Sequence, residues 1–87
     1  MQNINKFTNR NIEVSALDPL LKDVLMMFIN ENRASITMIQ RYFDVGYARG
    51  ARIMEQMEQC GFVSKLNNNC REVLISLEEY KLMFKDV

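Results

Sequence analysis

Arg49 and Arg52 are the residues of this 87-residue chain whose type and spacing point most directly to chemistry. Both lie in the stretch GYARGARIMEQMEQCGF, residues 46–62, near the start of what reads as one helix. The positive end of a helix dipole favours phosphate there. A guanidinium can also bind O6 and N7 of guanine with two hydrogen bonds. The pair therefore predicts DNA contact, with a simply solvated face as the alternative.

Further polar residues could support such a contact. Glu55 lies farther along the same helix and could accept a hydrogen bond from N4 of cytosine. Three basic residues could brace the DNA backbone from neighbouring segments, and for them contact and plain solvation remain evenly balanced: Arg41, Lys65 and Arg71.

Composition excludes several other function classes. The chain has no His, only two Cys (Cys60 and Cys70), and no phosphate-binding loop motif. Zinc sites, disulfide frameworks, His-based catalysis and nucleotide hydrolysis are therefore not predicted, and we expect neither an enzyme nor a cofactor. There is no apolar run of 18 residues and no secretory leader, so a cytoplasmic protein without a membrane segment is the expectation. A net charge of zero argues weakly against non-specific coating of nucleic acid.

Three helices are predicted, near 18–30, 37–43 and 46–60. Asp18 as N-cap and Pro19 as first helical residue open the first helix, which buries the stripe Leu21, Val24, Leu25 and Phe28. The pattern of Thr37 and Gln40 predicts a capping box for the second helix. A turn of three residues, DVG, then leads into the third, which makes a helix-turn-helix.

The third helix contains a glycine, Gly50, at a position where glycine costs about 1 kcal/mol relative to alanine. We predict that Gly50 and Ala51 face the preceding helices and allow close approach of the backbones. The inner face is predicted to consist of Tyr47, Gly50, Ala51, Met54 and Met57. Gly61 is suited to the left-handed position after a helix, with Phe62 as its hydrophobic contact.

The rest of the chain completes the expected fold. Two β-prone segments around Asn67 to Asn69 predict a hairpin over 62–75. Residues 77–87 form a tail that could hold a short helix with Leu77, Tyr80 and Phe84 on one side, and residues 1–17 read as a flexible arm. The prediction is an α+β, mainly α domain over 18–76: a winged helix-turn-helix of three helices and a β-hairpin wing.

Residues 18–76 closely resemble the C-terminal gamma domain of the FtsK/SpoIIIE DNA translocases. The motifs that carry the resemblance follow one another in the same order: RASI, Q-R-x-F-x-[IV]-G-Y-x-R-x-A-R-I-x-E-Q-M-E, G-x-V and REVL. They cover roughly two thirds of the chain. The resemblance implies a bacterial winged helix, linked to chromosome segregation, that reads short G-rich sequences in double-stranded DNA and contacts the XerD recombinase. It places Arg49, Arg52 and Glu55 where the family touches DNA.

The sequence departs from the family pattern at informative places. Ala48 replaces an Asn that could read a base, and an alanine offers at most a contact to a thymine methyl group. Asp44 stands where the family tends to have a basic residue. The motor is absent, so a stand-alone copy is expected not to translocate DNA. These departures, with the neutral net charge, support the alternative of a protein-interaction module that contacts a recombinase or a second copy of itself.

Overall fold

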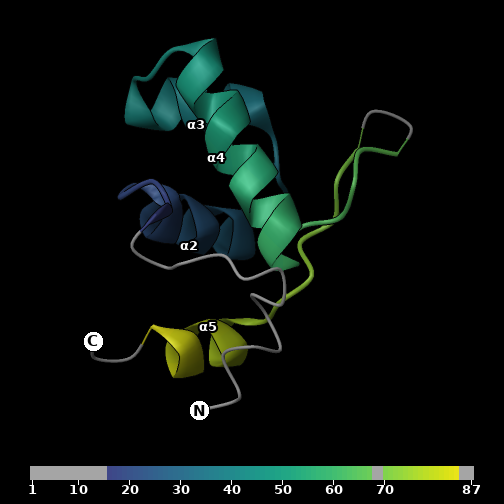
Figure 1. The fold of residues 1–87 in the computed structure, drawn as a ribbon. Coiled ribbons are helices and arrows are strands. Elements are labelled where there is room, and N and C mark those ends of the chain that lie inside the picture. Colours follow the sequence, from purple (N-terminus) through teal and green to yellow (C-terminus); the bar gives the residue numbers. More distant parts are fainter. Residues whose placement is uncertain (1–15, 68–69, 85–87) are drawn as a thin grey trace.

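The computed structural model describes residues 16–67 and 70–84. Four helices occur in these residues: α2 (Leu21–Glu31), α3 (Ile36–Phe43), α4 (Tyr47–Cys60) and α5 (Leu77–Met83). In Figure 1, α4 runs past both α3 and α2, α5 lies on the far side of α2 from α3, and residues 62–67 and 70–75 extend away to one side. Most of the predicted arm (1–15), two residues of the predicted turn (68–69) and the end of the tail (85–87) lie outside the described residues.

Helix α2 begins two residues later than predicted. Asp18 does not cap it as an N-cap residue; its Oδ1 accepts the Leu20 N–H at 2.8 Å, and its carbonyl accepts the Leu21 N–H at 2.9 Å. Pro19 and Leu20 thus form a turn, and the helix starts at Leu21. The predicted apolar stripe is confirmed, since all four of its members are buried: Leu21, Val24, Leu25 and Phe28.

Helix α3 is capped by Ser35, so the predicted capping box at Thr37 is wrong. Ser35 is extended and its Oγ accepts the Met38 N–H at 3.4 Å, which leaves Thr37 exposed inside the first turn. At the other end, Asp44 has φ 54°. Asp is among the non-glycine residues that tolerate this left-handed conformation best, which gives Asp44 a backbone role at the α3–α4 turn.

Helix α4 starts and ends almost as predicted. Gly46 is the N-cap, and Gly61 lies at φ 83° after the last turn. The Gly61 N–H binds the Glu58 carbonyl at 3.1 Å and the Phe62 N–H binds the Met57 carbonyl at 2.9 Å, the pattern of a Schellman motif. Its buried face comprises Gly50, Ile53, Met54, Met57 and Cys60. The predicted inner position of Tyr47 is wrong, because 63% of that residue is exposed.

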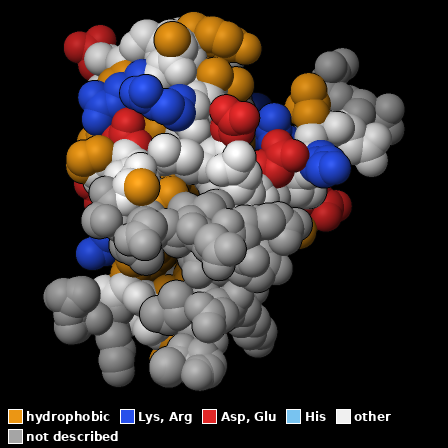
Figure 2. All heavy atoms as spheres, viewed as in Figure 1, with side chains coloured by type: hydrophobic (Ala, Val, Ile, Leu, Met, Phe, Trp, Pro, Cys, Tyr) orange, Lys and Arg blue, Asp and Glu red, His pale blue; other side chains and the backbone are white. Residues whose placement is uncertain are grey.

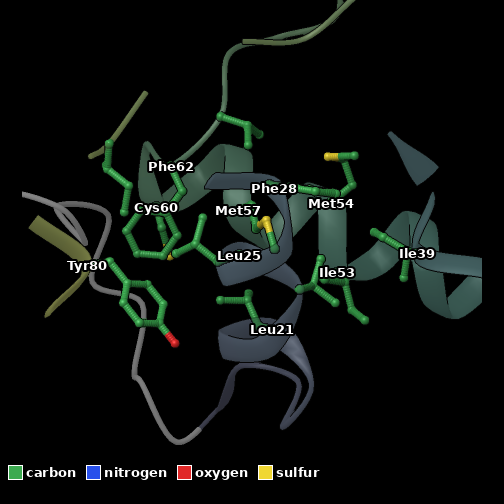
Figure 3. Packing of buried hydrophobic residues seen from close by; sticks show 13 residues of the cluster. Leu21, Leu25, Phe28, Ile39, Ile53, Met54, Met57, Cys60, Phe62 and Tyr80 are labelled. Atoms are coloured by element: carbon green, nitrogen blue, oxygen red, sulfur yellow. The ribbon is translucent and has the colours of Figure 1, made fainter. Parts of the chain in front are cut away.

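Side chains from all four helices and the 62–75 segment meet in one core. Figure 3 shows how the side chains of α2, α4, Phe62 and Tyr80 pack together, with Ile39 of α3 at one end. Burying such side chains is the main favourable contribution to folding. The core thereby fixes α4 against α2 and α3 and leaves its other face outward.

Residues 62–67 and 70–75 lie antiparallel to one another but contain no regular strand, so the described part of the chain does not show the predicted β-hairpin wing. They carry two isolated antiparallel bridges, Val63 with Val73 and Asn67 with Cys70. Between them, the Ser64 N–H binds the Glu72 carbonyl at 2.9 Å, but the Glu72 N–H binds the Ser64 Oγ instead of its carbonyl. A side chain thus takes one bond of the ladder, as serine can do, and regular strands do not propagate.

Helix α5 is closed at its start by a capping box. The Ser76 Oγ accepts the Glu79 N–H at 3.1 Å, while the Glu79 carboxylate accepts the Ser76 N–H at 2.8 Å. The S-x-x-E pattern at 76–79 was available in the sequence and predicts this start. Tyr80 is buried, and its hydroxyl donates to the Lys22 carbonyl of α2 at 3.3 Å. Across the described residues, no helix is long and apolar enough to cross a membrane.

Candidate nucleic-acid interface

The outward face of α4 carries a stripe of four exposed residues at helical spacing. They are Ala48, Arg52, Glu55 and Gln59, all exposed. The opposite face is buried against the core. Because positions i, i+4, i+7 and i+11 lie along one side of a helix, the core holds this stripe as a continuous outer surface. We call these four residues the α4 stripe.

Arg49 lies beside the α4 stripe and is paired. Its Nε and Nη2 donate to the two carboxylate oxygens of Asp18, each at 2.9 Å. The Asp18 side chain is only 5% exposed and the Arg49 side chain 41%. Asp18, which was predicted to cap α2, therefore accepts two hydrogen bonds from Arg49. These bonds connect the segment before α2 to α4.

Asp18 is itself held in place. Its backbone N–H donates to the Gln56 Oε1 of α4 at 2.9 Å, and its Oδ1 also accepts the Leu20 N–H. The hydrogen bond from Arg49, the Leu20 N–H and the positive charges of Arg49 and Arg52 keep the pKa of the Asp18 carboxyl below its usual value, against the opposing effect of burial. The same pairing raises the pKa of Arg49 above its usual value. The contacts of Asp18 with Arg49 and Gln56 were not predicted, because no local sequence pattern indicates them.

Arg71 is also engaged within the molecule. Its Nη1 donates to the Glu58 carboxylate at 2.9 Å and to the Ser64 carbonyl at 3.1 Å. Only 16% of its side chain is exposed. Arg71 therefore joins the 62–75 segment to α4 and occupies the carbonyl that a regular ladder would have used.

The remaining predicted basic residues are open to solvent. Arg52, Arg41 and Lys65 are exposed, and within the described ranges none of the three forms a salt bridge. Figure 2 shows Lys and Arg side chains gathered over the region of α3 and the N-terminal half of α4, with acidic and basic side chains interspersed farther along towards the 62–75 segment. The basic surface thus lies at the helix-turn-helix.

Two exposed aromatic residues flank the same turn and were not predicted. Tyr42, in the last turn of α3, is 68% exposed, and Tyr47, the first residue of α4, is 63% exposed. Both aromatic rings, each with a hydroxyl group, are therefore exposed on either side of the α3–α4 turn.

The cysteines show no sign of a shared site. Cys60 is buried in the core and Cys70 is exposed, and both are free. Burial raises the pKa of the Cys60 thiol. In the part of the chain that the structure describes, no group of three or more side chains could hold a metal ion.

These features define a mainly helical helix-turn-helix domain whose second helix, α4, buries one face and exposes Arg52 and Glu55 on the other. The chain belongs to the family of the Ftsk gamma domain, whose family model matches residues 15–76. This match confirms the family resemblance drawn from the sequence motifs.

Relatives with established names agree with this assignment. The chain is 48% identical over 64 residues to the DNA translocase FtsK of Haemophilus influenzae, a match that covers 74% of this chain and 12% of that protein. It is 38% identical over 74 residues to the DNA translocase FtsK of Clostridium tetani, covering 82% of this chain and 10% of that protein. The chain therefore corresponds to a small part of each relative's length.

Proposed function

We propose that this chain binds double-stranded DNA with sequence preference by placing α4 in the major groove. The observation that carries the proposal is the α4 stripe, which presents Arg52 and Glu55 outward while the opposite face is fixed by the core. A major groove of about 12 Å admits one α-helix and presents a distinct pattern at each base pair. Family membership and relatives named DNA translocases support the choice of DNA as the ligand.

Three of the four residues of the α4 stripe have a chemically defined part in this proposal. Arg52 binds O6 and N7 of guanine, Glu55 accepts from N4 of cytosine, and the methyl group of Ala48 contacts the methyl group of thymine. The exposed side chain of Arg52 has no salt-bridge partner among the described residues. All N–H groups of its guanidinium are therefore available to bind guanine.

The DNA backbone would be held from both sides of α4. Arg41, at the end of α3, and Lys65, in the 62–75 segment, are exposed cations suited to phosphate. In this arrangement residues 62–75 act as the wing of a winged helix. Arg71 serves the wing indirectly, since its contacts with Glu58 and Ser64 fix the segment that carries Lys65.

A DNA ligand implies work in the bacterial cytoplasm, and the family implies a part in chromosome segregation. One observation favours a second candidate, a protein-interaction module that contacts a recombinase of the XerD type or a second copy of the chain. Large apolar side chains are exposed at Tyr42, Tyr47, Leu66, Leu74 and Leu82. Tyrosine is enriched where proteins meet, although scattered exposure of apolar residues is also common.

Selection of bound duplexes from a random pool tests the proposal. A recovered motif, bound with an affinity that falls steeply as salt rises, is the expected result, because arginine and lysine contacts with phosphate release counterions. Recovery of no motif and no salt-sensitive binding, together with a complex between the chain and a XerD-type recombinase or a concentration-dependent oligomer, would replace DNA binding with the second candidate.

A further inference from the structure

The bidentate pair between Asp18 and Arg49 lies beside the α4 stripe and changes the part that Arg49 can play. We infer that Asp18 is a positioning residue that keeps Arg49 out of base recognition, so that the two side chains enter the DNA interface as one neutral pair. Of the two arginines of α4, only Arg52 then contacts bases. This inference rests on the proposed DNA binding and specifies which residues of that interface carry specificity.

In the Asp18–Arg49 pair, the edge of the guanidinium formed by Nε and Nη2 is already hydrogen-bonded. Nε and Nη2 of Arg49 each bind one oxygen of Asp18 at 2.9 Å. This fork is one of the two edges with which a guanidinium can grip a planar acceptor. With that edge bound, the guanidinium is held towards the start of α2, on the flank of α4, and the outer stripe is left to Arg52.

The Asp18 carboxylate cannot move outward together with the Arg49 side chain. The Asp18 side chain is 5% exposed, its Oδ1 also accepts the Leu20 N–H, and its backbone N–H is fixed to Gln56. Moving Arg49 into the groove would therefore leave a nearly buried carboxylate without its main partner. The carboxylate would keep only the Leu20 N–H, which is unfavourable for a charge so little exposed, and DNA phosphates nearby would add repulsion.

The net charge of the Asp18–Arg49 pair determines how strongly DNA binding depends on salt, and this dependence can be measured. Each net cation that neutralises a phosphate makes the slope of log K against log salt steeper by about 0.9. The neutral pair contributes nothing to that slope. Asp18→Asn removes the negative charge, keeps an oxygen for the Leu20 N–H, and leaves Arg49 as a net cation at the interface.

The experiment compares four proteins on the duplex selected by the wild type and on a scrambled duplex, over a range of salt concentrations. They are the wild type, Asp18→Asn, the double variant Asp18→Asn with Arg49→Gln, and the control Asp23→Asn. Asp23 is an exposed carboxylate of the first turn of α2, so its removal makes the same change in net charge away from Arg49.

We expect Asp18→Asn to steepen the slope by about 0.9 and to bind the scrambled duplex more tightly, so that its preference for the selected duplex falls. Asp23→Asn should change neither quantity. The double variant replaces a neutral pair with two neutral side chains, so its slope should return to that of the wild type. Duplex selection with the double variant should recover the wild-type motif, because Arg49 reads no base.

Two results would overturn the inference alone: a slope for Asp18→Asn equal to that of Asp23→Asn, or loss of preference at one base position in the double variant. Thermal unfolding checks that each variant is folded. Should Asp18→Asn not fold, duplex selection with Arg49→Gln alone decides, since an unchanged motif supports the inference and a relaxed position overturns it. A wild type without salt-sensitive duplex binding would overturn the proposed function and this inference with it.

Discussion

Gly50 of α4 and Ile36 of α3 lie so close that a β-carbon on Gly50 would stand 3.3 Å from Cγ2 of Ile36. The side chains of Ile39 and Gln40 would follow at 3.7 and 3.8 Å. Gly50 is buried, as the sequence predicted. The missing side chain therefore sets the spacing of the helix-turn-helix, and with it the position at which α4 presents its exposed stripe.

Gly50→Leu should lower the free energy of unfolding by about 1 to 3 kcal/mol, because the larger side chain overpacks the contact with α3. Urea unfolding followed by circular dichroism measures the change. Gly46→Ser is the matched control at the start of the same helix, where an added side chain meets nothing within 4 Å and φ is −76°. It should stay within about 0.5 kcal/mol of the wild type or gain stability as a better cap. Equal stability of both variants would contradict the close packing.

Arg52→Ala should cost about 1 to 3 kcal/mol of binding to the selected duplex and relax preference at one base position. Fluorescence anisotropy with single-base variants of the duplex measures both effects. Lys65→Ala is the comparison, since a phosphate contact weakens binding to all duplexes evenly and flattens the salt slope by about 0.9. If both variants lose affinity evenly without any change in base preference, Arg52 does not read a base.

Arg71→Met should destabilise the 62–75 segment by about 1 to 2 kcal/mol, because the Glu58 carboxylate and the Ser64 carbonyl both lose a charged donor. Hydrogen exchange of the backbone amides in this segment is the measurement. Lys65→Met serves as the control, because that side chain is exposed and forms no salt bridge in the described part of the chain. Equal exchange in both variants would mean that Arg71 does not hold the segment.

Asp18 should make stability depend on acid. Its pKa is lower in the folded protein than the usual value of 3.8, chiefly because of the hydrogen bond from Arg49. A carboxyl with a depressed pKa stabilises the folded state fully above its unfolded pKa, and loses that contribution as pH falls through the folded pKa. The stability advantage of the wild type over Asp18→Asn should therefore be constant above about pH 5 and shrink below about pH 4.

Urea unfolding at a series of pH values measures this dependence. Arg49→Gln is the control, because it removes the largest cause of the shift, and the acid-dependent loss between about pH 4 and the folded pKa should become smaller. An advantage of the wild type that stays unchanged down to about pH 2 would contradict the pairing in solution.

The two thiols should react at very different rates. Cys70 is exposed, whereas Cys60 is 2% exposed and burial raises its pKa, which lowers the fraction of reactive thiolate. A thiol-specific disulfide reagent should therefore modify one equivalent at once and the second only after unfolding. Cys70→Ser should remove the fast equivalent alone, and rapid modification of Cys60 in that folded variant would contradict the core position.

Local sequence patterns predicted most of the helical framework. The apolar spacing of α2 and the left-handed Gly61 are confirmed, because each depends on residues within a few positions of one another. The close approach at Gly50 is also confirmed, although its partners lie in the preceding helix α3. The errors at Asp18 and Thr37 are shifts of helix starts, which arise where several residues compete to cap the same turn. Tyr47 was wrongly assigned to the inner face. It is the first residue of α4, where the helical period continues but the side chain lies beyond the packed core.

By itself, the sequence determined where the helices lie to within about two residues at their starts, most of the residues on their apolar faces, and the family to which the chain belongs. Only the tertiary structure decided how the arginines are used. Asp18 and Arg49 are 31 positions apart, and Arg71 and Glu58 are 13 apart, so no helical or strand period relates either pair. The first contact exists because the core packs α4 against α2, and the second because Arg71 returns to the C-terminal end of α4. Hydrophobic patterning is read locally, whereas the pairing of charges depends on which surfaces the packed core brings together.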